Sequence, residues 1–252
     1  SVNRVQDNYV TQWGDPNYDN PEATGQAKPL PEELKVMRDG EYTVTNVPPR
    51  IKDIVTQIFE RIEAQEPGEP APLNNFEPGL VSVADAPFSF AASFNNGFAF
   101  AWHLEQHFQS IVSPIHCYGM VGVGRNYSPD TGSGAELYTV IGHAPRHLDR
   151  NIALVGRVIE GMQHLSSLPR GSGDLGFYTA EESAKRTPIL SVRVASDLPA
   201  AEQPAFEYLS TESATFATYA EAVANRRDPF FIVPAGGADI CNIRVPVRRV
   251  AD

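Results

Sequence analysis

The chain has 252 residues, of which 42% are hydrophobic and 20% are charged. This size suits one domain with additions or two small domains, and the hydrophobic fraction excludes disorder of the whole chain. Lys and Arg number 20 against 31 Asp and Glu, so the net charge is −11. Because such a surface repels phosphates and anionic lipids, we expect neither nucleic acid nor a membrane as a partner. Frequent proline (21) and glycine (19) favour a turn-rich, mostly β protein with some helices.

The first part of the chain mixes short β patterns with turn-rich segments. The expected elements are a strand at 1–13, a loop at 14–31, a strand at 41–47, a helix at 51–64, a linker at 65–79 and a hairpin at 88–108. In the helix, apolar residues recur at intervals of three and one, which predicts a single apolar stripe that covers a sheet. The hairpin is rich in aromatic residues, and Asn95-Asn96-Gly97 is typical of its turn.

The second part continues with short β segments and two helices. The expected elements are an apolar segment at 117–124, strands at 137–141, 152–159, 188–195, 230–233 and 240–247, and helices at 160–168 and 211–225. Ser210 or Thr211 is the expected N-cap of the last helix.

The two cysteines, Cys117 and Cys241, lie far apart in the sequence. A disulfide between them is compatible with the sequence but cannot be deduced from it. We favour two independent buried thiols, because free cysteine behaves as a small hydrophobic residue. The cysteines therefore do not indicate whether the protein resides in an oxidising or a reducing compartment.

Two motifs resemble cofactor sites only superficially. His103 and His107 are four residues apart, as in helical zinc sites, but the first is not followed by the Glu of the zinc-protease motif. The surrounding aromatic residues favour a strand, so we expect two partly exposed histidines. Gly122-Val123-Gly124-Arg125 lacks the third glycine of a dinucleotide loop, and Pro129 interrupts the helix that should follow. We expect no metal and no cofactor.

Three segments together are more specific. At 4–16 the chain reads RVQDNYVTQWGDP, with an arginine, an aromatic residue, a small apolar residue, a glutamine and Gly-Asp in order. At 132–149 it reads GSGAELYTVIGHAPRHLD, and at 151–168 it reads NIALVGRVIEGMQHLSSL. In order, spacing and residue character these segments resemble the cyclophilins, a family of peptidyl-prolyl cis-trans isomerases. The chain looks like an enlarged bacterial branch of the family, because about 100 residues separate the first segment from the next.

The resemblance implies a substrate pocket. Arg4 matches the catalytic arginine, and Gln12 matches the glutamine that orients the substrate. The residues that match the rest of the pocket are Tyr9 and Val10 at the apolar floor, Gly124 and Arg125 near the peptide-binding segment, Glu136, Tyr138 behind the proline ring, and His147 and Leu148 at the rim.

Three of the matched positions depart from the usual residue. Glu136 stands where glutamine is usual, His147 where many members carry tryptophan, and Ile152 where histidine is usual. Loss of the tryptophan implies weak or absent cyclosporin binding. Loss of the histidine affects the expected substrate range and rate, whereas the catalytic arginine is retained.

The resemblance also implies the fold: a closed eight-stranded antiparallel β-barrel capped by helices. We expect a cyclophilin-like domain at 1–199, with motif blocks at 1–16 and 116–196 and an insertion at 17–115. A C-terminal extension at 200–252 would pack on the barrel. In the family, two strands and a helix precede the arginine strand, and we therefore hypothesise that the chain is the C-terminal portion of a longer protein.

The implied activity is rotation of X-Pro bonds in peptides and unfolded polypeptides, which assists protein folding. Neither a nucleophile nor a cofactor is needed, because no covalent bond is made or broken. A proline-peptide-binding or chaperone module with faded catalysis is the alternative. A carbohydrate or hydrophobic-ligand site in the aromatic segment 88–108 is a third hypothesis. The scarcity of lysine and the bacterial resemblance favour the periplasm over the cytoplasm.

Overall fold

The computed structural model describes residues 1–15, 17–18, 23, 25–34, 37–66, 73–104, 110–143 and 145–250. The chain divides into two compact units. The first unit consists of Ser1–Tyr42 and His116–Pro204, and the second of Thr43–Ile115 and Ala205–Asp252. Most of the segment expected as an insertion therefore groups with the C-terminal extension.

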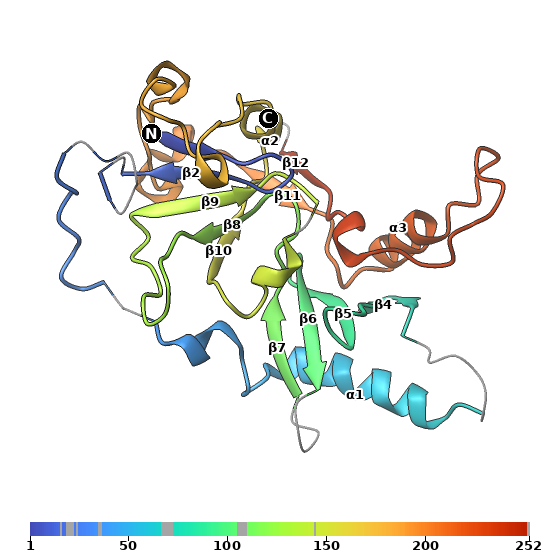
Figure 1. The fold of residues 1–252 in the computed structure, drawn as a ribbon. Helices are drawn as coiled ribbons and strands as arrows, with labels where there is room; N and C mark the ends of the chain where they lie inside the picture. Colours follow the sequence, from blue (N-terminus) through green and yellow to red (C-terminus); the bar gives the residue numbers. More distant parts are fainter. Residues whose placement is uncertain are drawn as a thin grey trace. The chain divides into compact units, whose positions relative to one another are not determined.

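The first unit is built on a five-stranded antiparallel sheet (Figure 1). Its strands are β1 (Val2–Val5), β2 (Val10–Gly14), β8 (Met120–Val123), β9 (Glu136–Val140) and β10 (Leu154–Arg157), in the order β1-β2-β9-β8-β10. Helix α2 (Met162–Ser166) contributes Met162 and Leu165 to one apolar cluster with Val2 and Val5. A second cluster is centred on Val10 and Tyr138.

The segment 1–13 is a hairpin and not the single strand that its apolar residues predict. The chain turns at Asn8, whose φ of +52° lies in the left-handed region that asparagine tolerates better than most residues. The Gln6 N–H donates to the Val10 carbonyl at 2.9 Å and closes the turn. Consequently Arg4 on β1 lies opposite Gln12 on β2.

The second unit contains another five-stranded antiparallel sheet, in which consecutive strands pair (Figure 1). Its strands are β3 (Asn75–Glu77), β4 (Leu80–Ala84), β5 (Ala91–Asn95), β6 (Phe98–Leu104) and β7 (Ser110–Pro114), and its helices are α1 (Pro49–Glu63) and α3 (Ala214–Asn225). Two short strands, β11 (Phe206–Tyr208) and β12 (Val247–Arg249), pair separately.

Both helices bury apolar side chains against this sheet. The α1 stripe, including Ile54 and Ile58, packs on Trp102. On α3, Phe216 meets Phe94 edge to face, with ring centroids 5.0 Å apart. The buried aromatic residues of 88–104 thus form the core of the second unit, which argues against a ligand site made of their rings.

Several expected elements are confirmed. Helix α1 begins at Pro49, where a proline is compatible with the first helical turn. The β5–β6 hairpin turns at Asn96 and Gly97, with φ values of +48° and +79° as a tight hairpin turn requires. Helix α3 is also present, but its N-cap is Ser213 and neither Ser210 nor Thr211. The Ser213 Oγ accepts the Phe216 N–H at 3.1 Å.

Four of the strands expected from the sequence are wrong. The segment 41–47 contains the end of a 3₁₀ turn, Asp39–Tyr42, and one isolated bridge at Val44. Residues 188–195 and 230–233 form no strand, and 240–247 contains the 3₁₀ turn Ile240–Asn242. Their apolar residues resemble a strand pattern, yet Leu190 is 91% exposed, because no neighbouring strand within the described residues covers it.

The mostly β character with few helices is confirmed, whereas the closed eight-stranded barrel is not. In the described part of the chain, hydrogen bonds link the first unit's strands into an open ladder from β1 to β10. Also within these residues, no helix has the length and apolar character required to cross a bilayer.

The cysteines differ from the expected free thiols. Neither Cys117 nor Cys241 is free, and both are disulfide-bonded. The expectation failed because the sequence around a cysteine does not show whether its side chain is a buried free thiol or part of a disulfide.

Candidate active site

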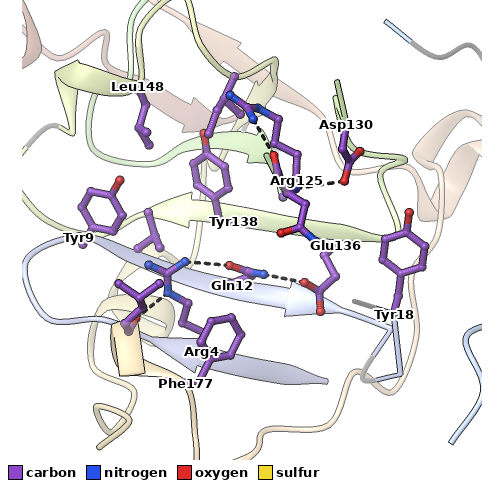
Figure 2. A pocket seen from close by; sticks show the side chains of 15 residues that line it. Arg4, Tyr9, Gln12, Tyr18, Arg125, Asp130, Glu136, Tyr138, Leu148 and Phe177 are labelled. Atoms are coloured by element: carbon purple, nitrogen blue, oxygen red, sulfur yellow. Dashed lines mark hydrogen bonds between the residues drawn. The ribbon is translucent and has the colours of Figure 1, made fainter. Parts of the chain in front are cut away.

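A row of paired residues crosses the first unit's sheet. Arg4 lies opposite Gln12, Gln12 opposite Tyr138, and Tyr138 opposite Gly122. Directly opposed residues on adjacent strands project to the same face of a sheet. Residues from four strands, β1, β2, β9 and β8, therefore meet on one face, and Figure 2 shows Arg4, Gln12 and Tyr138 side by side there.

A pocket of about 330 Å³ opens over this row. Nine of the ten residues named from the sequence line it: Arg4, Tyr9, Val10, Gln12, Gly124, Arg125, Glu136, Tyr138 and Leu148. The tenth, His147, stacks on Tyr9 with ring centroids 5.6 Å apart, and its Nε2 lies 3.0 Å from the Tyr9 hydroxyl. His147 thus contacts a wall residue from outside the lining.

The Arg4 guanidinium is held from several directions. Its Nε donates to the Leu175 carbonyl at 2.7 Å, its Nη1 donates to Gln12 Oε1 at 3.2 Å, and its Nη2 donates to Gln6. The guanidinium carbon lies 5.3 Å from the Phe177 ring centroid. Burial lowers the pKa of Arg4, but an arginine stays protonated in proteins, so the wall carries a fixed cation.

A buried carboxylate orients the glutamine. Gln12 Nε2 donates to Glu136 Oε2 at 2.6 Å, and the Asn3 amide donates to Glu136 Oε1. An ionised carboxylate can only accept, so the NH₂ group of Gln12 faces Glu136 and its carbonyl oxygen faces Arg4. Figure 2 shows this chain of contacts from Arg4 through Gln12 to Glu136.

The opposite side of the pocket is apolar. Val10, Tyr138, Leu148 and Ile152 belong to one packed cluster. Burial raises the pKa of both Tyr9 and Tyr138, so both phenols are protonated near neutral pH. A substrate on this side would meet uncharged surface, with the Arg4 guanidinium across from it.

At the end of the pocket that Arg125 and Asp130 line, hydrogen bonds to the backbone hold the loop in place. Arg125 donates to the Asn151 carbonyl from Nε at 3.1 Å and from Nη2 at 2.8 Å, and to the Asn126 carbonyl at 2.6 Å. The Asp130 carboxylate accepts the Asn126 N–H at 3.1 Å and the Gly132 N–H at 2.8 Å. These bonds shape the loop that follows β8 and leave its backbone along the pocket (Figure 2).

Six lining residues were not assigned from the sequence: Tyr18, Asn126, Asp130, Ile152, Leu175 and Phe177. Ile152 was noted only as a departure from histidine. Leu175 and Phe177 lie far from Arg4 in the sequence, and an isolated bridge between Phe177 and Arg4 brings them to β1. No periodicity or motif in that segment indicates this contact.

The structure describes one histidine of the pair. His103 lies on β6, is buried, and has its Nε2 3.1 Å from Ser113 Oγ, so the expected partial exposure is wrong for it. His107 lies outside the described residues. Among those that are described, no group of three or more His, Cys, Asp or Glu could hold a metal ion.

Comparison with known proteins agrees with the resemblance. Residues 1–194 match the family model described as cyclophilin type peptidyl-prolyl cis-trans isomerase/CLD. A crystal structure of cyclophilin AquaCyp293 from Hirschia baltica is similar in fold, with a TM-score of 0.61 and 18% identity over 98% of this chain and 75% of that one. No curated protein matches significantly.

Proposed function

The chain belongs to the cyclophilin-type peptidyl-prolyl cis-trans isomerase family, and on this premise we propose that it catalyses X-Pro bond rotation with Arg4 as the central catalytic group. One observation carries the proposal. A fixed guanidinium, hydrogen-bonded to Leu175 and Gln12, faces the apolar side of a pocket large enough for a proline ring.

The chemistry needs selective binding and no bond cleavage. Rotation breaks amide resonance, a barrier of roughly 18–20 kcal/mol. In the twisted state the prolyl nitrogen regains its lone pair and can accept a hydrogen bond. A guanidinium placed over that nitrogen binds the twisted amide better than either planar form, and such differential binding accelerates the rotation.

The other pocket residues support this role. Val10, Tyr138 and Leu148 would seat the ring, and exclusion of water there strengthens the contact with Arg4. Gln12 would orient the neighbouring carbonyl of the substrate. Glu136 would act through Gln12, because its carboxylate oxygens bind Asn3 and Gln12.

The biological setting follows as part of the proposal. Substrates would be proline-containing peptides and unfolded polypeptides, and the activity would assist folding. Cyclosporin would bind weakly, because His147 replaces the usual tryptophan and is engaged with Tyr9. A bacterial periplasm is the proposed location, supported by the disulfide-bonded cysteines, since disulfides persist in oxidising compartments.

The second candidate is a proline-peptide-binding or chaperone module without appreciable catalysis. The observation that favours it is Ile152, which places an aliphatic side chain at the pocket where the family usually has histidine. The retained Arg4 favours the isomerase.

An isomerase assay on a proline tetrapeptide separates the two. Arg4→Ala should lower kcat/KM by about 100-fold or more, as expected when one preorganised donor to the transition state is lost. Arg193→Ala is the matched control, because Arg193 is exposed and outside the pocket, and it should retain wild-type activity. Binding of the peptide without turnover by the wild type would favour the binding module instead.

A further inference from the structure

A buried chain of polar side chains lies behind the proline pocket. The Tyr138 hydroxyl is 2.7 Å from His116 Nε2, and His116 Nδ1 is 2.8 Å from Asp149 Oδ1. The Arg146 Nε donates to Asp149 Oδ2 at 2.6 Å. The four residues are almost fully buried, with His116 at 0% exposure. Only Tyr138 reaches the pocket, so the other three are unused by the proposed mechanism.

For a neutral His116 ring, the contacts give a consistent order of donors and acceptors along this chain. Burial opposes ionisation of Asp149, but its hydrogen bonds with His116 and Arg146 prevail and lower the pKa of the carboxyl. The ionised carboxylate accepts from His116 Nδ1–H and from the His116 backbone N–H, the latter at 2.9 Å. In the neutral imidazole, Nε2 is then an acceptor. In that form of the ring, the Tyr138 O–H donates to Nε2.

This arrangement points the hydroxyl away from the reacting groups. Figure 2 shows the Tyr138 oxygen on the side of the ring remote from Arg4 and Gln12. The ring itself lies over Gly122, where an added Cβ would stand 2.3 Å from the Tyr138 Cζ. Because Gly122 has no side chain, the Tyr138 ring fills the space above it, and His116 binds the hydroxyl at the end of the ring.

We infer that His116, held by Asp149 and Arg146, is a positioning residue that fixes the Tyr138 hydroxyl outside the pocket, so that a tyrosine serves as an apolar wall for the proline ring. The inference rests on the proposed function of the pocket. Without the acceptor at His116, a buried phenol has an unsatisfied donor, and the ring must shift to satisfy it. The wall would then move or expose its polar edge to the substrate.

Three variants test this role: His116→Leu, Tyr138→Phe and the double variant. His116→Leu should reduce kcat/KM by about tenfold, since the unsatisfied phenol displaces the wall. Tyr138→Phe keeps the ring and removes only the hydroxyl, so its kcat/KM is the reference level for the double variant. The double variant should regain the Tyr138→Phe level, since no phenol is left to satisfy. A role of His116 that does not act through the Tyr138 hydroxyl predicts no such rescue.

A second readout does not depend on catalysis. The hydroxyl proton of Tyr138 should give a slowly exchanging proton NMR signal in the wild type, assigned by its loss in Tyr138→Phe. This signal should also be lost in His116→Leu. If His116→Leu fails to fold, the positioning role is tested by the hydroxyl signal of the wild type and by the kcat/KM of the double variant.

The results separate the two proposals. A double variant as slow as His116→Leu, an unimpaired His116→Leu, or absence of the hydroxyl signal in the wild type would overturn the positioning role. A catalytically inactive wild type that still shows the hydroxyl signal, lost in His116→Leu, would overturn the isomerase and leave the positioning of Tyr138 standing.

Discussion

Glu136 illustrates how one side chain can set the behaviour of two others. The family usually has glutamine here, and two glutamines side by side could each present either end of the amide. A carboxylate removes this freedom, because it can only accept from Gln12 and Asn3. The Gln12 oxygen is thereby reserved for Arg4. The residue identified from the sequence as a substrate contact thus has its clearest role behind Gln12.

Glu136→Gln should weaken catalysis without abolishing it. The Gln12 amide could then reverse, and Arg4 would lose Gln12 as one of its acceptors for part of the time. We expect kcat/KM to fall by about three- to tenfold, in line with the net contribution of one ordinary hydrogen bond. Steady-state kinetics measure this, with Glu60→Gln on the exposed face of α1 as the control. An unchanged rate would show that the orientation of Gln12 does not depend on the charge.

At the scale of elements, the segment 172–185 is a loop that contacts Arg4. Its Leu175 carbonyl and Phe177 ring contact Arg4. Glu182 ties the segment together by accepting from Lys185 and from the backbone N–H groups of Ser172 and Thr179. The loop thus supports the pocket although it contains no regular strand or long helix.

The pH dependence of stability should report on Glu182. Its hydrogen bond with Lys185, together with those to the backbone, lowers its pKa from 4.5 to about 2 in the folded protein. A lowered pKa means that the stabilisation is complete above pH 4.5 and is lost as the pH falls toward 2. The midpoint temperature of thermal unfolding should therefore be higher for the wild type than for Glu182→Gln near pH 6. This difference should shrink as the pH falls from 4.5 toward 2. A difference independent of pH would contradict the assignment.

Individual elements also show what the sequence can and cannot predict. The helix at 51–64 and the hairpin at 88–108 were predicted because a single apolar stripe and an Asn-Gly turn are local signals, and the structure has them as α1 and as the β5–β6 hairpin. The segment 188–195 was wrongly expected to be a strand, because alternation cannot show whether a neighbouring strand exists. The site row was predictable through the family resemblance, whereas Phe177 reaches Arg4 only through tertiary contact.

For the chain as a whole, the family match covers residues 1–194, and the two compact units divide the chain differently. The second unit combines a segment before β8 with the C-terminal residues, and its sheet is covered by α1 and α3. The expected single domain at 1–199, the packing of 200–252 on it and the existence of a longer parent chain stay predictions. The proposal of an oxidising compartment is supported by the disulfide-bonded cysteines.

A thiol count tests the disulfide directly. The denatured, unreduced protein should show no reactive thiol, and the reduced protein should show two, since Cys117 and Cys241 are the two cysteines of the chain. Reaction with a chromogenic disulfide reagent measures both states. Two thiols before reduction would contradict the disulfide and remove the support for an oxidising compartment.

The role of Arg4 is tested most directly by exchange NMR on a proline peptide bound to the protein, which separates binding from rotation. Wild type should interconvert the bound cis and trans forms rapidly. Arg4→Ala should still bind the peptide through the apolar wall but interconvert it at least about 100-fold more slowly. Equal interconversion rates in the two proteins at matched occupancy would contradict the account, because the guanidinium would then contribute nothing to the twisted state.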